Sequence, residues 1–169
     1  SALDFSDPFG QGGIVRAARE GTVILSATCP HTIRIDHTSS PDGWQTGYFH
    51  VINIAVSNGQ WVNRWQQIAV QGRGYCDSPQ PDAAHVHLTL RQNNVFKDFA
   101  GHVIGGHIVY DGAEQYEGCL YRFYDDQWSC PGNSVWNEGL VGSGWPEAPA
   151  NTELVRNGGF NTDVSSWTF

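Results

Sequence analysis

Histidines are the residues of this sequence best suited to chemistry. The chain has seven of them, although only 15% of its 169 residues are charged. His85 and His87 flank Val86 in the run HVHLTLRQ, where apolar and polar residues alternate. Side chains of a strand alternate between its two faces, so both imidazoles are expected on one face with the apolar residues on the other. Imidazole is the commonest protein ligand of zinc, and the pair therefore predicts a metal or catalytic site.

Two further positions could join this pair. His50 follows Tyr48-Phe49 at the end of an apolar run, and Asp4 stands between apolar neighbours in SALDFS. A carboxylate between apolar residues is costly to bury unless it is paired or bound to a cation. Asp4 and His50 are therefore candidates for the same site, and ordinary surface histidines are the alternative.

The elements that must position these residues are predicted to be strands. Short runs rich in Val, Ile, Thr, Tyr and Trp are broken by Gly, Asn, Asp and Pro, which is typical of an all-β protein. Strands are expected at 21–28, 32–37, 46–54 and 67–71 as a meander, followed by the strand that carries the histidine pair.

A domain boundary is expected near the carboxyl end. Residues 142–152 are rich in small residues and Pro and lack periodicity, as linkers are, so 1–141 is predicted to be one domain. Residues 153–169 resemble the opening strand of a β-sandwich carbohydrate-binding module, which implies the start of a truncated second domain that could bind polysaccharide. A disordered tail is the alternative.

Charge and hydropathy exclude several partners. A net charge of −8 disfavours nucleic acid and anionic membrane surfaces, because both are bound through Lys and Arg. No stretch approaches the roughly 20 apolar residues of a membrane span. We expect a monomer without a membrane or nucleic-acid partner.

Four cysteines without a CxxC motif favour disulfides over a zinc ribbon. Cys119 and Cys130 flank an aromatic-rich segment that is predicted to form a hairpin, and a bridge between them leaves Cys29 for Cys76. Disulfides persist in oxidising compartments, so a secreted, extracellular protein is expected. Four reduced, buried cysteines in a cytosolic protein are the alternative.

Taken together, the motifs resemble the lysostaphin-type zinc metalloendopeptidases, in the branch of β-lytic metalloendopeptidase and staphylolysin. The resemblance covers residues 1–139 and is carried by SALDF, the GTV strand, GWQTGYFH, VSNGQWV, HVH and the two late cysteines. It implies an antiparallel barrel-sandwich hybrid with long loops.

The resemblance also implies roles for individual residues. Asp4 and His87 would be zinc ligands, His85 the general base, and His50 its partner in activating water and stabilising the oxyanion. Tyr116 lies near a tyrosine that the branch uses to bind the tetrahedral intermediate, although an aromatic packed beside the disulfide is the alternative. The remaining zinc ligand would be a histidine upstream of Asp4, so we expect the chain to begin inside the domain.

Two positions depart from the branch pattern. Ala83-Ala84 replaces the usual Gly-Pro before the histidine pair, and Phe49 replaces a tyrosine, which removes one hydroxyl.

The sequence therefore predicts a bacterial, secreted zinc endopeptidase. The resemblance implies that its substrates are Gly-Gly or Gly-X bonds in peptidoglycan cross-bridges or glycine-rich proteins. An inactive family member that binds peptidoglycan or a partner enzyme is the main alternative. A sugar-binding lectin would explain residues 153–169 but not the histidines and Asp4.

Overall fold

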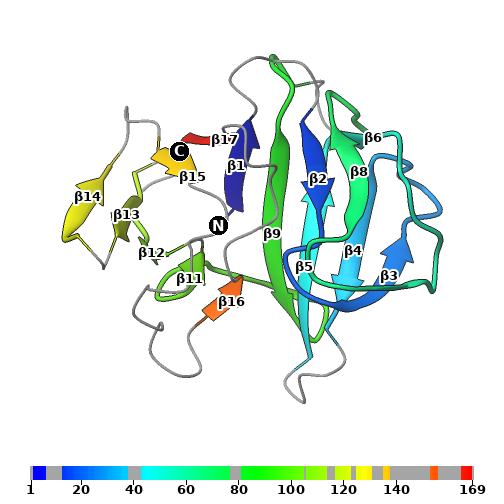
Figure 1. Ribbon diagram of the computed structural model, residues 1–169, viewed down its shortest axis with the longest axis horizontal. Helices are drawn as coiled ribbons and strands as arrows, with labels where there is room; N and C mark the ends of the chain where they lie inside the picture. The colour runs from blue at the N-terminus through cyan, green and yellow to red at the C-terminus, as the bar shows by residue number, and fades with distance from the viewer. Residues whose placement is uncertain are drawn as a thin grey trace.

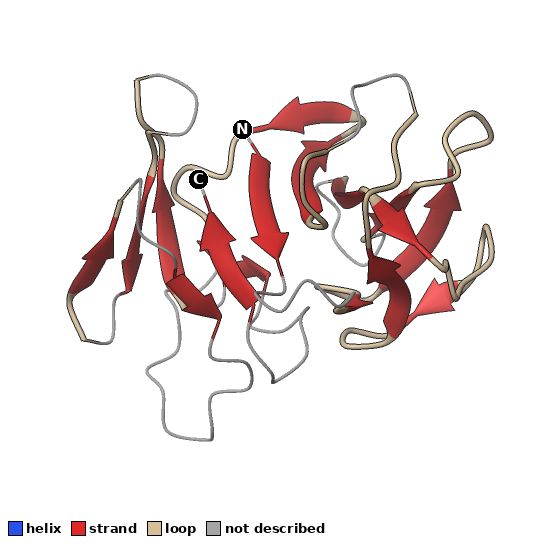
Figure 2. Ribbon diagram, turned by 90° about the horizontal axis from the view of Figure 1, so that it is seen from above, coloured by secondary structure: helices blue, strands red, loops and turns tan. Residues whose placement is uncertain are grey.

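The computed structural model of the chain consists of strands and loops. It describes residues 2–6, 13–37, 43–76, 81–104, 106–113, 117–122 and 125–130, together with the backbone of three short strands beyond them. No helix occurs among these residues (Figure 2). The predicted all-β class is confirmed. None of the described residues forms a helix long and apolar enough to cross a membrane.

The largest sheet contains Asp4 and His87, and His50 and His85 directly adjoin its strands. Its strand order is β15-β17-β1-β9-β5-β4-β3-β7, with β10 paired to β9, and Figure 1 shows β9 between β1 and β5. Its strands are β1 (Ala2–Ser6), β3 (Gly21–Leu25), β4 (Thr32–Asp36), β5 (Trp44–Phe49), β7 (Trp61–Val62), β9 (Val86–Gln92), β10 (Val95–Lys97), β15 (Val135–Asn137) and β17 (Ser165–Thr168).

Period-two alternation decides which face of this sheet is buried. On β9, Val86, Leu88 and Leu90 are at most 1% exposed, as the sequence predicts. They join one apolar cluster with Leu3 and Phe5 of β1. The opposite face of the sheet carries the histidine pair.

A three-stranded sheet contributes to the same apolar cluster. It contains β2 (Ile14–Arg16), β8 (Gln67–Gln71) and β6 (Val51–Ile52), in the order β2-β8-β6. The predicted four-strand meander is thus wrong at its last member. β3, β4 and β5 are consecutive neighbours, but the strand at 67–71 lies in this second sheet. The place beside β5 is taken by β9, which pairs with it from Trp44↔Gln92 to Phe49↔His87.

The predicted strand at 46–54 is interrupted in the structure. β5 ends at Phe49 and β6 begins at Val51, and the residue between them, His50, has a φ of 64°. Such a left-handed backbone cannot continue a strand. The chain therefore leaves the large sheet at His50 and enters the three-stranded one.

The third sheet has the order β14-β13-β12-β11-β16 (Figure 1). Its strands are β11 (Val103–Ile104), β12 (His107–Tyr110), β13 (Cys119–Arg122), β14 (Gln127–Ser129) and β16 (Glu153–Val155). β13 and β14 pair antiparallel, which confirms the predicted hairpin. β16 pairs with β11, and β17 pairs with β1 and β15. The division into two domains stays a prediction.

A buried hydrogen-bond chain fixes the middle of the large sheet. The Tyr48 hydroxyl accepts a hydrogen bond from the Ala18 backbone N–H at 2.8 Å and lies 3.2 Å from Thr46 Oγ1. His37 Nε2 lies 3.0 Å from the same Thr46 oxygen, and His37 Nδ1 donates to the Glu20 carbonyl. Burial raises the pKa of Tyr48 to about 12.

Tyr48→Phe is therefore expected to lower the free energy of unfolding by about 1 to 3 kcal/mol, because the buried Ala18 N–H loses its acceptor. Urea denaturation measures the change. Tyr75→Phe is the matched control, since that tyrosine is 49% exposed. Equal changes in the two variants would contradict the role given to the Tyr48 hydroxyl.

Candidate active site

One row of cross-strand neighbours brings the candidate residues together. Asp4 of β1 lies opposite His87 of β9, and His87 lies opposite Phe49 of β5. Directly opposed residues project from the same face of a sheet, so Asp4 and His87, 83 positions apart in the chain, become neighbours. Phe49 packs edge-on against the His87 ring, with the ring centroids 5.9 Å apart.

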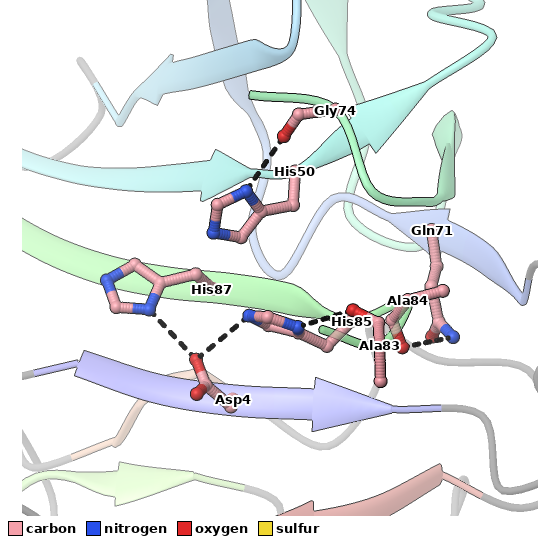
Figure 3. Close-up of polar contacts among 8 residues, drawn as sticks. All are labelled: Asp4, His50, Gln71, Gly74, Ala83, Ala84, His85 and His87. Carbon is pink, nitrogen blue, oxygen red and sulfur yellow. Dashed lines mark hydrogen bonds and ion pairs between the residues drawn. The ribbon is translucent and has the colours of Figure 1, made fainter. Parts of the chain in front are cut away.

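Three potential metal ligands converge at this row. Asp4 Oδ1 lies 2.8 Å from His87 Nδ1 and 3.8 Å from His85 Nε2 (Figure 3). The ligand atoms of these three residues all lie within 4.8 Å of one another. Ligand atoms of a tetrahedral zinc ion at about 2.0 to 2.1 Å from the metal are separated by roughly 3.4 Å. The nitrogen and oxygen donors of this group therefore fit zinc in type and spacing.

The His85 ring is oriented by the backbone. Its Nδ1 lies 3.0 Å from the Ala83 carbonyl oxygen (Figure 3). A carbonyl can only accept, so Nδ1 carries the proton and Nε2 of the neutral ring has the lone pair. The Gln71 side-chain amide donates to the Ala84 carbonyl and ties down the segment before the ring. Nε2 of His85 is thus held beside Asp4 as a proton acceptor.

The His50 ring lies beside the rings of His85 and His87, on the side away from Asp4 (Figure 3). Its Nδ1 lies 2.8 Å from the Gly74 carbonyl oxygen, and its ring lies 4.8 Å from the His85 ring (Figure 3). Burial lowers the pKa of His50; the Gly74 hydrogen bond raises it, and the charges of His85 and His87 lower it further. The neutral ring, with its proton on Nδ1, presents a proton acceptor at Nε2. Stabilising an oxyanion would require the protonated ring.

A cleft of about 610 Å³ adjoins the site. Phe49 and His50 line it at the site, and Gly74, Tyr75 and the Cys29–Cys76 disulfide line it on the side of the loop after β8. A cleft bounded by these groups can accept an extended peptide next to the histidines.

The structure brings Asp4, His50, His85 and His87 into one cluster and leaves Tyr116 outside the described residues. The Gly74 carbonyl was not a sequence candidate. It lies 24 positions from His50, and a backbone acceptor leaves no side-chain signal.

The predicted disulfide pairing is confirmed. Cys29 is bonded to Cys76, and Cys119 to Cys130. The first bridge joins the loop after β3 to the segment that contains Gly74. It therefore tethers the hydrogen-bond acceptor of His50.

Comparison with known proteins places these features in context. The model of peptidase family M23 matches residues 1–99, which is more than half of the chain. Protease LasA of Pseudomonas aeruginosa is 30% identical over 136 residues, which is 75% of this chain and 31% of that protein. Beta-lytic metalloendopeptidase of Lysobacter enzymogenes is 30% identical over 132 residues, or 73% of this chain and 71% of that protein.

A comparison with solved structures also finds an M23 peptidase. The M23 metalloprotease pseudoalterin superimposes with a TM-score of 0.65 and 25% identity, covering 77% of this chain and 79% of that one. This chain spans about a third of the length of the LasA proteins it matches.

Replacing Cys29 and Cys76 by Ser is expected to lower the free energy of unfolding by about 2 to 4 kcal/mol and to release the Gly74 carbonyl from His50. NMR of the histidine ring protons would detect the second effect as a changed His50 signal. The control is the Cys119 and Cys130 double serine variant, whose bridge lies in another sheet. It should lose stability and keep the His50 signal. The same His50 change in both variants would contradict the tethering role.

Proposed function

The chain belongs to peptidase family M23, and we propose that it is the catalytic part of a secreted bacterial zinc metalloendopeptidase. The observation that carries the proposal is the convergence of Asp4, His85 and His87 beside a cleft, with His50 completing the cluster. Carboxylate and imidazole donors in one partly buried group suit metal-assisted hydrolysis.

Asp4 and His87 are proposed to hold the zinc ion, with a histidine upstream of Ser1 as the third protein ligand that the resemblance implies. Zinc, when bound there, would polarise the scissile carbonyl and lower the pKa of the attacking water to about 7. His85 could supply a ligand by distance alone. We assign it instead to proton transfer, the role that the resemblance implies, and its Ala83 hydrogen bond leaves Nε2 free to accept a proton.

His85 is proposed to take the proton of the attacking water at Nε2 and return it to the leaving amine. An imidazole suits both steps, because the same nitrogen can accept a proton and then donate it. His50 presents a second Nε2 acceptor to the same space and is proposed to orient the water. Tyr116 is proposed to donate a hydrogen bond to the developing oxyanion.

The proposed substrates are Gly-Gly or Gly-X bonds in peptidoglycan cross-bridges or glycine-rich proteins. Glycine-rich chains lack side chains, so the walls formed by Phe49, His50 and Tyr75 would not exclude them. Residues 153–169 are proposed to begin a polysaccharide-binding module. We propose a monomer, and the two disulfides support an extracellular location.

The test uses a chain extended upstream of Ser1 to include the expected histidine. His87→Ala should lose both zinc and activity. His85→Ala should keep zinc and lower the rate of pentaglycine cleavage by roughly 10² to 10⁴, the usual contribution of a positioned general base. Atomic absorption measures zinc, and amine release measures cleavage.

His102→Ala is the matched histidine control, because that ring packs against Trp44 away from the cluster. It should keep zinc and activity. Loss of zinc in His85→Ala would contradict its role as base and make it a ligand. If the extended wild type binds zinc but cleaves neither glycine peptides nor peptidoglycan, the chain is a binding protein.

A further inference from the structure

The cleft extends beyond the histidines to two arginines. Arg34 of β4 and Arg91 of β9 both line it, together with Phe49 and His50. Arg34 lies two residues along β4 from Thr32, which is paired with Phe49, and Arg91 lies four residues along β9 from His87. At about 3.3 Å per residue, the backbone positions of the arginines are roughly 7 and 13 Å from the histidine row.

Neither guanidinium is neutralised within the described part of the chain. The ion pairs found there involve other residues, and no carboxylate lies within 4.0 Å of Arg34 or Arg91. Arg34 Nε is buried and has no hydrogen-bond partner among the described residues. Both side chains are only partly buried, so their guanidinium groups can be reached from the cleft that they line.

Arg91 is also held in place. Its guanidinium carbon lies 3.6 Å from the centre of the Phe96 ring, and Nη1 donates to the Asn94 carbonyl at 3.2 Å. Burial and the positive charge of Arg34 lower the pKa of Arg91, which indicates that the two cations act on one another. A fixed guanidinium loses little entropy when it binds an anion.

A glycine lines the cleft on the strand between the two arginine-bearing strands. Gly47 of β5 lies directly opposite Arg34 and also lines the cleft. A Cβ atom at Gly47 would meet Thr89 Oγ1 at 2.5 Å, and that hydroxyl is buried without a hydrogen-bond partner among the described residues. Thr89 occupies the space beside Gly47, so a residue with a Cβ atom at position 47 would displace it.

We propose that Arg34 and Arg91 form a carboxylate subsite of the peptide cleft, an inference that rests on the proposed peptidase function. Guanidinium groups bind carboxylates with charge-assisted hydrogen bonds. A peptide extended along the cleft would place there a carboxylate two to four residues from the scissile bond. Both an acidic side chain and a free carboxyl terminus offer this chemistry.

Peptide binding to the metal-free chain tests the subsite without hydrolysis. Fluorescence polarisation in the presence of a chelator would compare three labelled peptides: pentaglycine amide, pentaglycine with a free carboxylate, and tetraglycine followed by glutamate amide. At least one of the carboxylate peptides should bind about 10-fold more tightly than pentaglycine amide, as expected for a charge-assisted hydrogen bond. The peptide that gains affinity identifies the source of the carboxylate.

Arg34→Gln and Arg91→Gln should each remove most of this gain and leave binding of pentaglycine amide unchanged. Arg64→Gln is the matched control, because it makes the same charge change on an exposed residue that does not line the cleft. Equal affinity of wild type for all three peptides would overturn the proposal. So would an equal loss in Arg64→Gln, since the effect would then come from net charge.

A second measurement uses the wild type alone and therefore does not require that the variants fold. Acetate at constant ionic strength should compete with the preferred carboxylate peptide on the wild type and should not affect pentaglycine amide. Absence of competition would overturn the subsite. Cleavage without carboxylate preference would reject the subsite and keep the peptidase. Carboxylate preference in a chain that never cleaves would reject the peptidase and keep an anion-binding cleft.

Discussion

The site depends on the register between β1 and β9. Asp4 lies opposite His87 only because Leu3 and Phe5 on either side are buried, at 5% and 1% exposure, against the apolar face of β9. A slip by one residue would turn Asp4 into the apolar cluster and expose both neighbours. Burying an ionised carboxylate there would be strongly unfavourable, so the apolar core selects the register that brings the proposed metal ligands together.

Paired strands position Asp4 and His87, whereas an irregular backbone segment positions His50. Asp4 and His87 project from paired strands, whose hydrogen bonds fix the distance between them. His50 instead has a φ of 64°, and its ring is fixed by the carbonyl of Gly74. Left-handed backbone at a non-glycine residue is costly and persists where surrounding contacts enforce it. The Cys29–Cys76 bridge beside Gly74 is one such constraint.

Much of this arrangement could be predicted because strand periodicity is a local signal. The alternation in HVHLTLRQ identified both the core residues and the histidine pair, and the hairpin between Cys119 and Cys130 followed from its aromatic halves. Long-range pairing could not be predicted in the same way. The insertion of β9 beside β5, the break at His50 and the acceptor at Gly74 depend on contacts between distant segments. Arg34 and Arg91 were missed for the same reason, since only the sheet brings them into one cleft.

The face of β9 opposite the core carries residues of both the histidine site and the arginine subsite. His87, Thr89 and Arg91 alternate with Leu88 and Leu90, so one strand carries the proposed metal ligand and a proposed substrate contact. Their separation is fixed by the rise of a strand, about 3.3 Å per residue, and by the core residues between them. If the scissile bond of an extended peptide lies at the histidines, the arginines contact residues at a fixed number of positions from that bond. The alternation that buries one face of β9 would then determine at which residue of the peptide the cleft favours an acidic group.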